Sequence, residues 1–203
     1  MVRSMGYSVV DTLIFTILGM VACTCAAYPL SKKRLKGKGF FTFVLMVPMY
    51  FSAGMIPAYL LMNDLNLLDT MWVLILPLIY SPYNMLVMKT YFQSSIPESL
   101  EESAFLDGAT NLQILFKIVL PLSKPIIATL SLFYAVGRWN AYGDNMYYIK
   151  KDSLRLIQYK LYLLVQGAEA SIATSLGDVG GASNTTTPEV LQAACIMFVT
   201  IPI

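Results

Sequence analysis

The chain has 203 residues, of which 57% are hydrophobic and 13% are charged, and its formal net charge is +2. The charged share is about half of that in soluble domains. A soluble fold of this length cannot bury so much apolar surface, which favours lipid as the solvent. The sequence contains no histidine, so the commonest general base and the commonest metal ligand are excluded.

Three uncharged stretches occupy the first half of the chain: residues 12–31, 39–63 and 70–88. As helices, all three are long enough to cross a hydrocarbon core of about 30 Å. Asp11 interrupts the approach to the first stretch, which is too long for the apolar region of a signal peptide, so we expect a retained span. Prolines predict kinks in these helices, at Pro48, Pro57, Pro77 and Pro82.

Two further apolar segments follow. The fourth runs from about Pro125 to Tyr142 and contains Arg138, and the fifth begins near Val190 and is still apolar at Ile203. At 1.5 Å per residue the fifth reaches only about 21 Å, which is too short to cross. The sequence therefore predicts an all-α, polytopic membrane helical bundle with about five spans.

The three cysteines, Cys23, Cys25 and Cys195, all lie in apolar runs. Their spacing suits neither a redox pair nor a zinc site, so we interpret them as packing residues and expect no metal and no cofactor. The phosphate-binding pattern G-x-x-x-x-G-K-[ST] is also missing from the sequence, so we expect neither ATP binding of that kind nor enzymatic activity.

Charge between the apolar stretches predicts which loops share a side of the membrane. Residues 31–38 carry five basic side chains, which marks the cytoplasmic side; a nucleic-acid or lipid-headgroup patch is the alternative. Residues 63–69 carry two acidic side chains and no basic one, so we place them outside. The loop over residues 93–124 then returns to the cytoplasm. Residues 145–189 lie outside despite four basic side chains, because long loops follow the rule less strictly.

The cytoplasmic segment 95–121 predicts two short helices joined by a sharp turn. Ser95-x-x-Glu98 and Thr110-x-x-Gln113 are capping boxes, and Gly108 stands where a left-handed residue ends a helix. The second helix is expected to carry one apolar stripe, formed by Leu112, Leu115, Phe116 and Val119. Such an element either fills a groove on a partner and passes on its motion, or caps the bundle at the interface.

This segment resembles the EAA loop of binding-protein-dependent ABC importer permeases. That motif is E-A-A, three residues, a glycine, nine residues and I-x-L-P. The chain has Glu102-Ser103-Ala104, Gly108 and Ile118-Val119-Leu120-Pro121 at that spacing, with Ser103 for the second alanine. The resemblance implies that ten positions couple the chain to an ATPase subunit, and that Glu102, Ser103, Ala104 and Gly108 shape the coupling helix and its turn. The ten are Leu100, Glu102, Ser103, Ala104, Phe105, Asp107, Gly108, Ile118, Leu120 and Pro121. Leu100 and Phe105 are expected to help fill the groove of the ATPase.

Flanking sequences resemble carbohydrate-type, MalG-like permeases. They are Ala26-Ala27-Tyr28-Pro29-Leu30-Ser31, Trp139-Asn140-x-Tyr142 and Thr187-Pro188-Glu189-Val190-Leu191-Gln192-Ala193-Ala194. The resemblance implies a permease domain over residues 1–203 that includes the coupling loop at 95–121. The family implies six spans, so this chain is expected to begin at the second and to end inside the last.

The resemblance further implies an ATP-driven importer that carries a carbohydrate or oligosaccharide across the cytoplasmic membrane by alternating access. Its partners would be ABC ATP-binding subunits, which hydrolyse ATP, a second permease subunit, an extracellular solute-binding lipoprotein and membrane lipid, with no nucleic acid. Two alternatives remain: an ABC permease for another solute, such as an amino acid, phosphate or polyamine, and a secondary transporter or channel that works without ATP. A membrane enzyme is disfavoured because no nucleophile constellation or carboxylate pair lies in a span.

Arg138 is costly within an apolar span unless it is paired or faces water. In one interpretation it belongs to a solute pathway with Trp139, Asn140 and Tyr142, in which the aromatic rings stack on sugar faces. In the other it snorkels to the outer interface, where Trp and Tyr also gather. The position of Arg138 in the outer part of the span favours snorkelling, with Asp144 as a partner.

Overall fold

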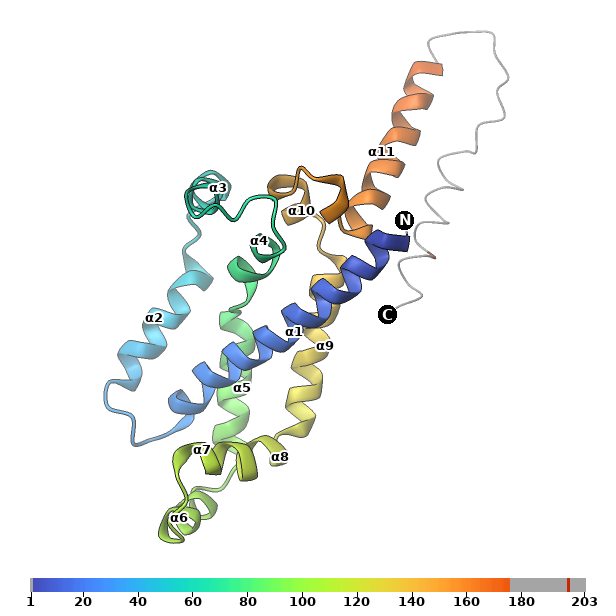
Figure 1. The fold of residues 1–203 in the computed structure, drawn as a ribbon. Helices are drawn as coiled ribbons and strands as arrows, with labels where there is room; N and C mark the ends of the chain where they lie inside the picture. Colours follow the sequence, from blue (N-terminus) through green and yellow to red (C-terminus); the bar gives the residue numbers. More distant parts are fainter. Residues whose placement is uncertain (1, 176–196, 198–203) are drawn as a thin grey trace.

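The computed structural model describes residues 2–175 and 197 of the chain (Figure 1). All regular structure in this part is helical, which confirms the expected all-α class. The elements are α1 (Val2–Ser31), α2 (Lys38–Tyr50), α3 (Met55–Asp64), α4 (Trp72–Ile75), η1 (Leu76–Leu78), α5 (Pro82–Ser95), α6 (Glu98–Leu106), α7 (Asn111–Ile114), η2 (Leu115–Val119), α8 (Leu120–Leu122), α9 (Lys124–Asn140), α10 (Gly143–Tyr148), η3 (Asp152–Leu154) and α11 (Ile157–Ser175). The fifth apolar segment, apart from Met197, lies outside the described residues, as do Cys195 and the Thr187–Ala194 motif.

Helices α1, α5 and α9 form the centre of the bundle, with α1 packed against both others. Their contact buries large apolar side chains, among them Phe15, Met88 and Leu130. Gly19 allows the closest approach, because a Cβ added there would lie 2.8 Å from a ring carbon of Tyr134. Cys23 is buried in this core and Cys25 is exposed, both as free thiols.

Within the described residues, one helix is long and apolar enough on its own to cross a membrane, from Arg3 to Ser31, and up to four spans result if each bent helix pair counts as one. The stretches 39–63 and 70–88 are therefore not the continuous helices that their lack of charge predicts. The pairs α2–α3 and α4–α5 are bent by 110° and 52°.

The four prolines for which kinks were predicted lie at or next to these breaks. Pro48 lies in the last turn of α2 and Pro57 in the first turn of α3. Pro77 lies in η1, and Pro82 begins α5. A proline removes a backbone donor and displaces the carbonyl four residues earlier, so the helix ends or bends there.

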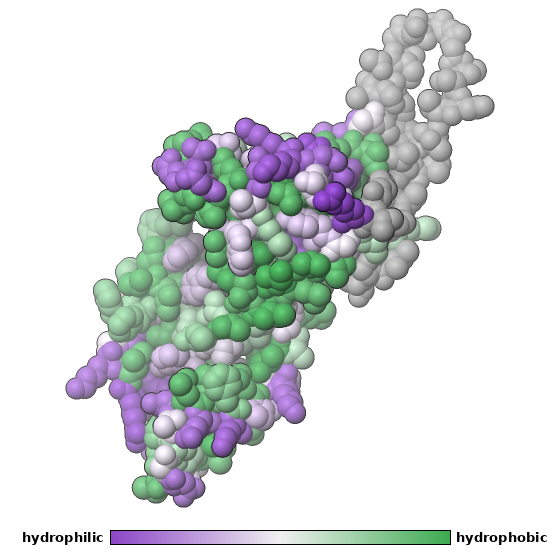
Figure 2. Space-filling model, viewed as in Figure 1, coloured by the Kyte–Doolittle hydropathy of each residue, from purple (hydrophilic) through white to green (hydrophobic). Residues whose placement is uncertain are grey.

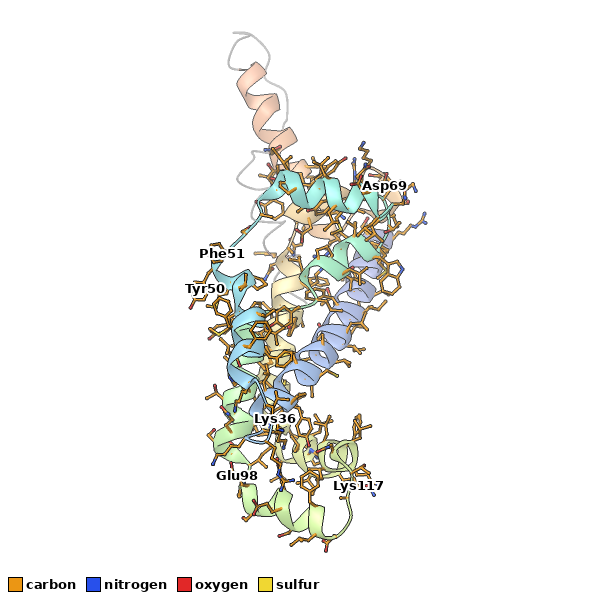
Figure 3. All side chains as sticks on the ribbon, turned by 90° about the vertical axis from the view of Figure 1, so that its left-hand side faces the viewer. Lys36, Tyr50, Phe51, Asp69, Glu98 and Lys117 are labelled. Carbon is orange, nitrogen blue, oxygen red and sulfur yellow. The ribbon has the colours of Figure 1, made fainter. Side chains whose placement is uncertain are left out.

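A broad apolar band separates two polar ends in the face shown in Figure 2. Asp69 lies at one end, and Lys36, Glu98 and Lys117 lie at the other (Figure 3). Tyr50 and Phe51 project from the side between the two ends, 72% and 76% exposed. Large apolar side chains are thus exposed over the middle of the bundle, as expected of a surface covered by lipid or by another membrane subunit.

The loops pair at the two ends as their charges predict. At one end Gln93 donates a hydrogen bond to the carbonyl oxygen of Ser31 at 3.2 Å, so the two loops expected in the cytoplasm lie together. At the other end the backbone N–H of Asp69 donates to the carbonyl oxygen of Tyr148 at 3.1 Å, so the two loops expected outside also meet.

Candidate functional site

The first helix of the coupling segment, α6, begins differently from the prediction. Ser95 is the last residue of α5, and Pro97 occupies the N-cap of α6 without a side-chain cap. The predicted Ser95–Glu98 capping box is therefore wrong: the preceding helix extends through Ser95, and the linker is only Ile96 and Pro97. Ile96 is 6% exposed and anchors this linker in the core. Glu98 and Glu101 fall in the first turn, where the helix dipole favours negative charge.

The end of α6 confirms the predicted turn. Gly108 has φ +79°, in the left-handed region that glycine enters without strain. The N–H of Ala109 donates to the carbonyl of Ala104 at 2.9 Å, and the N–H of Gly108 donates to that of Phe105 at 3.0 Å. These two bonds are the Schellman arrangement, which satisfies the last carbonyls of a helix and reverses the chain sharply.

The second helix starts with the predicted capping box. The Thr110 N–H donates to Gln113 Oε1 at 2.8 Å, and the Gln113 N–H donates to Thr110 Oγ1 at 3.4 Å. The expected apolar stripe is only partly right. Leu115 and Val119 are buried, whereas Leu112 and Phe116 are 67% and 64% exposed.

A π-helical turn over η2 (Leu115–Val119) widens the helical repeat in this segment. It does not account for the exposure of Leu112, which lies before it in α7. Pro121 lies two residues after the turn, and its ring would clash with an undistorted carbonyl of Lys117.

The predicted coupling residues divide between two faces of the segment. Ala104 is buried, and Phe105 packs against the core with the Arg34 guanidinium 5.1 Å from its ring centre. Phe105 thus faces the bundle, contrary to the expectation that it fills a groove on a partner. Ile118 and Leu120 also pack against the core. The exposed residues are Leu100, Glu102, Ser103, Asp107, Gly108 and Pro121.

Leu106 was missed by the sequence reasoning, although it is 90% exposed at the tip of α6. The signal was its position directly before the helix-ending pair Asp107-Gly108, where the side chain leaves the bundle. Together with Leu112 and Phe116 it presents apolar groups on a polar end of the molecule. A shallow hollow of about 280 Å³ lies beside the turn, lined by Asp107, Gly108, Ala109, Gln113, Ile114, Lys117 and Ile118.

The basic loop after α1 forms ion pairs with the coupling segment. Lys32 forms an ion pair with Glu101, and Lys33 forms one with Glu98 at 2.9 Å. Tyr28 donates a hydrogen bond to the carbonyl of Asn111 at 3.2 Å. A groove of about 860 Å³ runs between the two segments. Opposite charges on loops assigned to the same side of the membrane were the signal for this contact.

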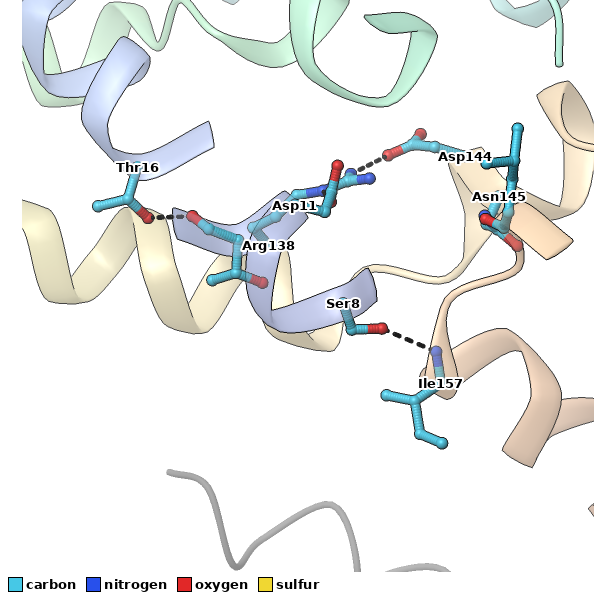
Figure 4. A network of polar contacts seen from close by, with 9 residues as sticks. Ser8, Asp11, Thr16, Arg138, Asp144, Asn145 and Ile157 are labelled. Atoms are coloured by element: carbon cyan, nitrogen blue, oxygen red, sulfur yellow. Dashed lines mark hydrogen bonds and ion pairs between the residues drawn. The ribbon is translucent and has the colours of Figure 1, made fainter. Parts of the chain in front are cut away.

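Arg138 neither snorkels nor opens into a solute pathway in this structure. Its Nε donates to Asp11 Oδ2 at 2.6 Å and its Nη1 donates to Asp144 Oδ2 at 3.1 Å, with the Arg138 and Asp11 side chains each 1% exposed (Figure 4). The expected partner Asp144 is confirmed. Asp11 was missed because, in sequence, it only interrupts an apolar approach.

The other predicted pathway residues have different surroundings. Trp139 is buried in a cluster with Ile157 and Leu161. Asn140 is exposed, and Tyr142 is 44% exposed and stacks on Tyr162 with 5.0 Å between ring centres. Only Asn140 and Tyr142 therefore remain accessible from this group.

Comparison with known proteins identifies the family. Residues 15–143 match the family described as the binding-protein-dependent transport system inner membrane component. The chain belongs to this family. It is a permease of the inner membrane, and this family of transport components is not catalytic. The family works with ATP-binding subunits, a second permease and a solute-binding protein. The expected class, location and partners are thereby confirmed.

Similar proteins cover nearly the whole chain. The polygalacturonan/rhamnogalacturonan transport system permease YtcP of Bacillus subtilis is 41% identical over 202 residues, which cover 99% of this chain and 69% of that protein. LplC of the same organism is 38% identical over 204 residues, covering 99% and 67%. A crystal structure of a bacterial ABC transporter that imports the acidic polysaccharide alginate aligns with a TM-score of 0.79 and 32% identity, over 98% of this chain and 71% of that chain.

Proposed function

We propose that this permease forms part of the pathway for a carbohydrate, in the form of an oligosaccharide, and is driven by a separate ATPase that docks on residues 95–121. The observation that carries the coupling role is the Gly108 turn, which projects exposed apolar groups from the end of the bundle. The relatives with 41% and 32% identity, named for polygalacturonan/rhamnogalacturonan and alginate, support a saccharide as the solute.

Docking on the ATPase would use the exposed side of the segment. Leu106 supplies the main apolar contact, with Leu112 and Phe116 beside it, because these side chains are free of the core. Burying one such side chain stabilises a contact by about 1.5–3 kcal/mol. Leu100, Glu102, Ser103 and Asp107 would line the rim, and the small Ser103 allows close approach.

Movement of the ATPase would reach the spans through the opposite face of the same helix. Ala104 and Phe105 pack on the core, and the Lys32–Glu101 ion pair joins α6 to the end of α1. Ile118, Leu120 and Pro121 connect the second helix to α9. A short helix held on one face by the bundle and on the other by the ATPase transmits a rigid-body motion.

Contact with the solute is proposed for Asn140 and Tyr142, which are exposed at the outer end of α9. Arg138 and Trp139 are buried there and would support these residues indirectly. The phenol ring of Tyr142 offers an edge and a hydroxyl group to a sugar, since one of its faces is stacked on Tyr162.

The test is uptake of oligogalacturonate into vesicles that contain the permease with its ATPase, second permease and binding protein. Leu106→Asp is expected to abolish ATP-dependent uptake while the chain still inserts in the membrane. Leu65→Asp is the matched control, because Leu65 is 56% exposed in the loop over residues 63–69, which is expected on the opposite side of the membrane. Uptake that continues with a hydrolysis-deficient ATPase would favour a secondary transporter, and uptake of amino acids but of no saccharide would refute the solute class.

A further inference from the structure

The chain that follows α9 folds back on itself and forms a compact unit, which we call the outer cap (residues 141–162). Asn145 is fully buried, and its Nδ2 donates to the carbonyl of Leu154 at 3.2 Å, which links α10 to η3. Tyr142 stacks on Tyr162, which links the start of the cap to α11. These contacts hold α10, η3 and the start of α11 together as one packed unit.

Polar contacts attach this outer cap to α1, which lies more than 100 residues away in sequence (Figure 4). The hydroxyl of Ser8 accepts a buried hydrogen bond from the N–H of Ile157, at 2.9 Å. Arg138 bridges Asp11 on α1 and Asp144 on α10 from the last turn of α9. One guanidinium thus joins three elements, and its fork shape allows both carboxylates to be bound at once.

Stability alone is a poor explanation of this cluster. Two carboxylates face one guanidinium, and Asp11 Oδ1 and Arg138 Nη2 have no hydrogen-bond partner within residues 2–175. Buried ion pairs with unsatisfied atoms contribute little net stability, and well-packed apolar residues often do as well. What a charged bridge provides over apolar packing is one defined arrangement of the elements that it joins.

The location of the cap and the groups that hold it favour a role of Arg138 in fixing the position of the cap. The cap lies at the end of the bundle that carries Asp69, opposite the coupling segment. Asp69 holds the cap from the other side, because its Oδ1 accepts hydrogen bonds from the N–H groups of Lys150 and Lys151 at 2.5 and 3.0 Å. A force applied to the cap from outside therefore reaches α1 through the Arg138 bridge and the Ser8–Ile157 hydrogen bond, and it reaches α9 through Arg138 and through the continuous chain.

We propose that Arg138 is a positioning residue that fixes the outer cap to α1, so that a protein pressing on the cap moves α1 and α9 together. The proposal rests on the function proposed above, because it takes the pressing partner to be the solute-loaded binding protein. Asp11 and Asp144 are the two ends of the bridge. Loss of Asp11 breaks the bridge at α1 and leaves the Arg138–Asp144 contact in place, whereas loss of Asp144 breaks the bridge at the cap and leaves the Arg138–Asp11 contact in place.

Hydrogen exchange in the complete complex in lipid discs tests the attachment. Asp11→Asn and Asp144→Asn are each expected to speed exchange of the amides of residues 143–148 by about tenfold or more, since a charged hydrogen bond is lost. Exchange in residues 98–114 should stay unchanged. Asp152→Asn is the matched control, because the ion pairs of Asp152 go to Arg155 and Lys160 inside the cap and not to α1. Equal exchange in all variants overturns the proposal.

A second measurement separates transmission from a merely structural role. We compare ATP hydrolysis with and without binding protein saturated with oligogalacturonate. In Asp144→Asn the stimulation is expected to fall about fivefold or more while unstimulated hydrolysis is kept, and Arg138→Lys should retain part of it. Faster exchange with full stimulation overturns the proposal. A wild-type complex that the binding protein does not stimulate contradicts the proposed function instead, and the exchange measurement still decides whether the bridge holds the cap.

Discussion

Substitution of Gly108 gives the sharpest test of the coupling segment, because its cost is conformational and not steric. A Cβ added at Gly108 meets no atom within 4 Å, yet the residue has φ +79°. For alanine the left-handed conformation costs roughly 1–2 kcal/mol, and asparagine adopts it more readily. A cost of about 1.4 kcal/mol shifts the population of the closed turn tenfold. We therefore expect uptake to fall in the order glycine, asparagine, alanine and valine.

The assay is ATP-dependent uptake of oligogalacturonate in vesicles, with the amount of assembled complex measured in parallel. Gly137→Ala is the matched control, since Gly137 lies inside α9 without a positive φ and has no atom within 4 Å of an added Cβ. Alanine is favoured over glycine inside a helix by up to about 1 kcal/mol, so this variant should be neutral or stabilising. Full uptake by Gly108→Val, or an asparagine variant as impaired as valine, would refute the reasoning. Gly108→Asp and Glu102→Lys are expected to uncouple transport without loss of membrane insertion.

Three further predictions concern packing, charge and pH. Gly19→Leu is expected to destabilise the chain by about 1–3 kcal/mol, because the added atoms collide with Tyr134; a melting temperature equal to wild type would contradict this. Reversal of the charge at either Lys32 or Glu101 should impair coupled transport, and reversal of both charges together should restore part of it. If the loss of transport in the double variant equals the sum of the two single losses, the ion pair is contradicted. Hydrogen bonds from the N–H groups of Lys151 and Lys150 lower the pKa of Asp69, so the stability it provides is present above about pH 4 and is lost as the pH falls through the depressed value. Asp69→Asn should remove this acid dependence in melting curves, and an unchanged curve would refute it.

Much of the fold follows from patterns that repeat along the sequence. Charge-free runs locate the spans, and loop charges pair the ends correctly, because the cost of moving charge into lipid acts on every residue. Local rules also locate the Gly108 turn and the Thr110 cap, since both depend on backbone geometry within a few residues. The absence of charge does not show where a helix breaks within an uncharged run, although the prolines lie at or next to the breaks.

Long-range partners were beyond such patterns. Asp11 and Arg138 are separated by 127 positions in sequence, and the residues around each of them contain no pattern that indicates the other as its partner. The π-helical turn over η2 was missed because helical periodicity assumes a constant repeat. The exposure of Leu112 and Phe116 was missed because packing against the rest of the bundle determines which face of a short helix is buried. The position of Phe105 was predicted wrongly for a related reason. An apolar residue on an interfacial helix can pack either on the bundle or on a partner protein, and only the tertiary structure shows which.

The unbroken helix α1 connects the two polar ends of the bundle. Asp11 belongs to the outer bridge, and Tyr28 contacts the coupling segment seventeen positions later, about 26 Å along a helix axis. Among the candidate spans of the described residues only α1 crosses without a sharp bend. A straight helix transmits displacement along its length, whereas a bent pair absorbs it at the break. The arrangement of straight and bent spans therefore makes α1 a direct mechanical connection between the outer cap and the coupling segment on which we propose that the ATPase docks.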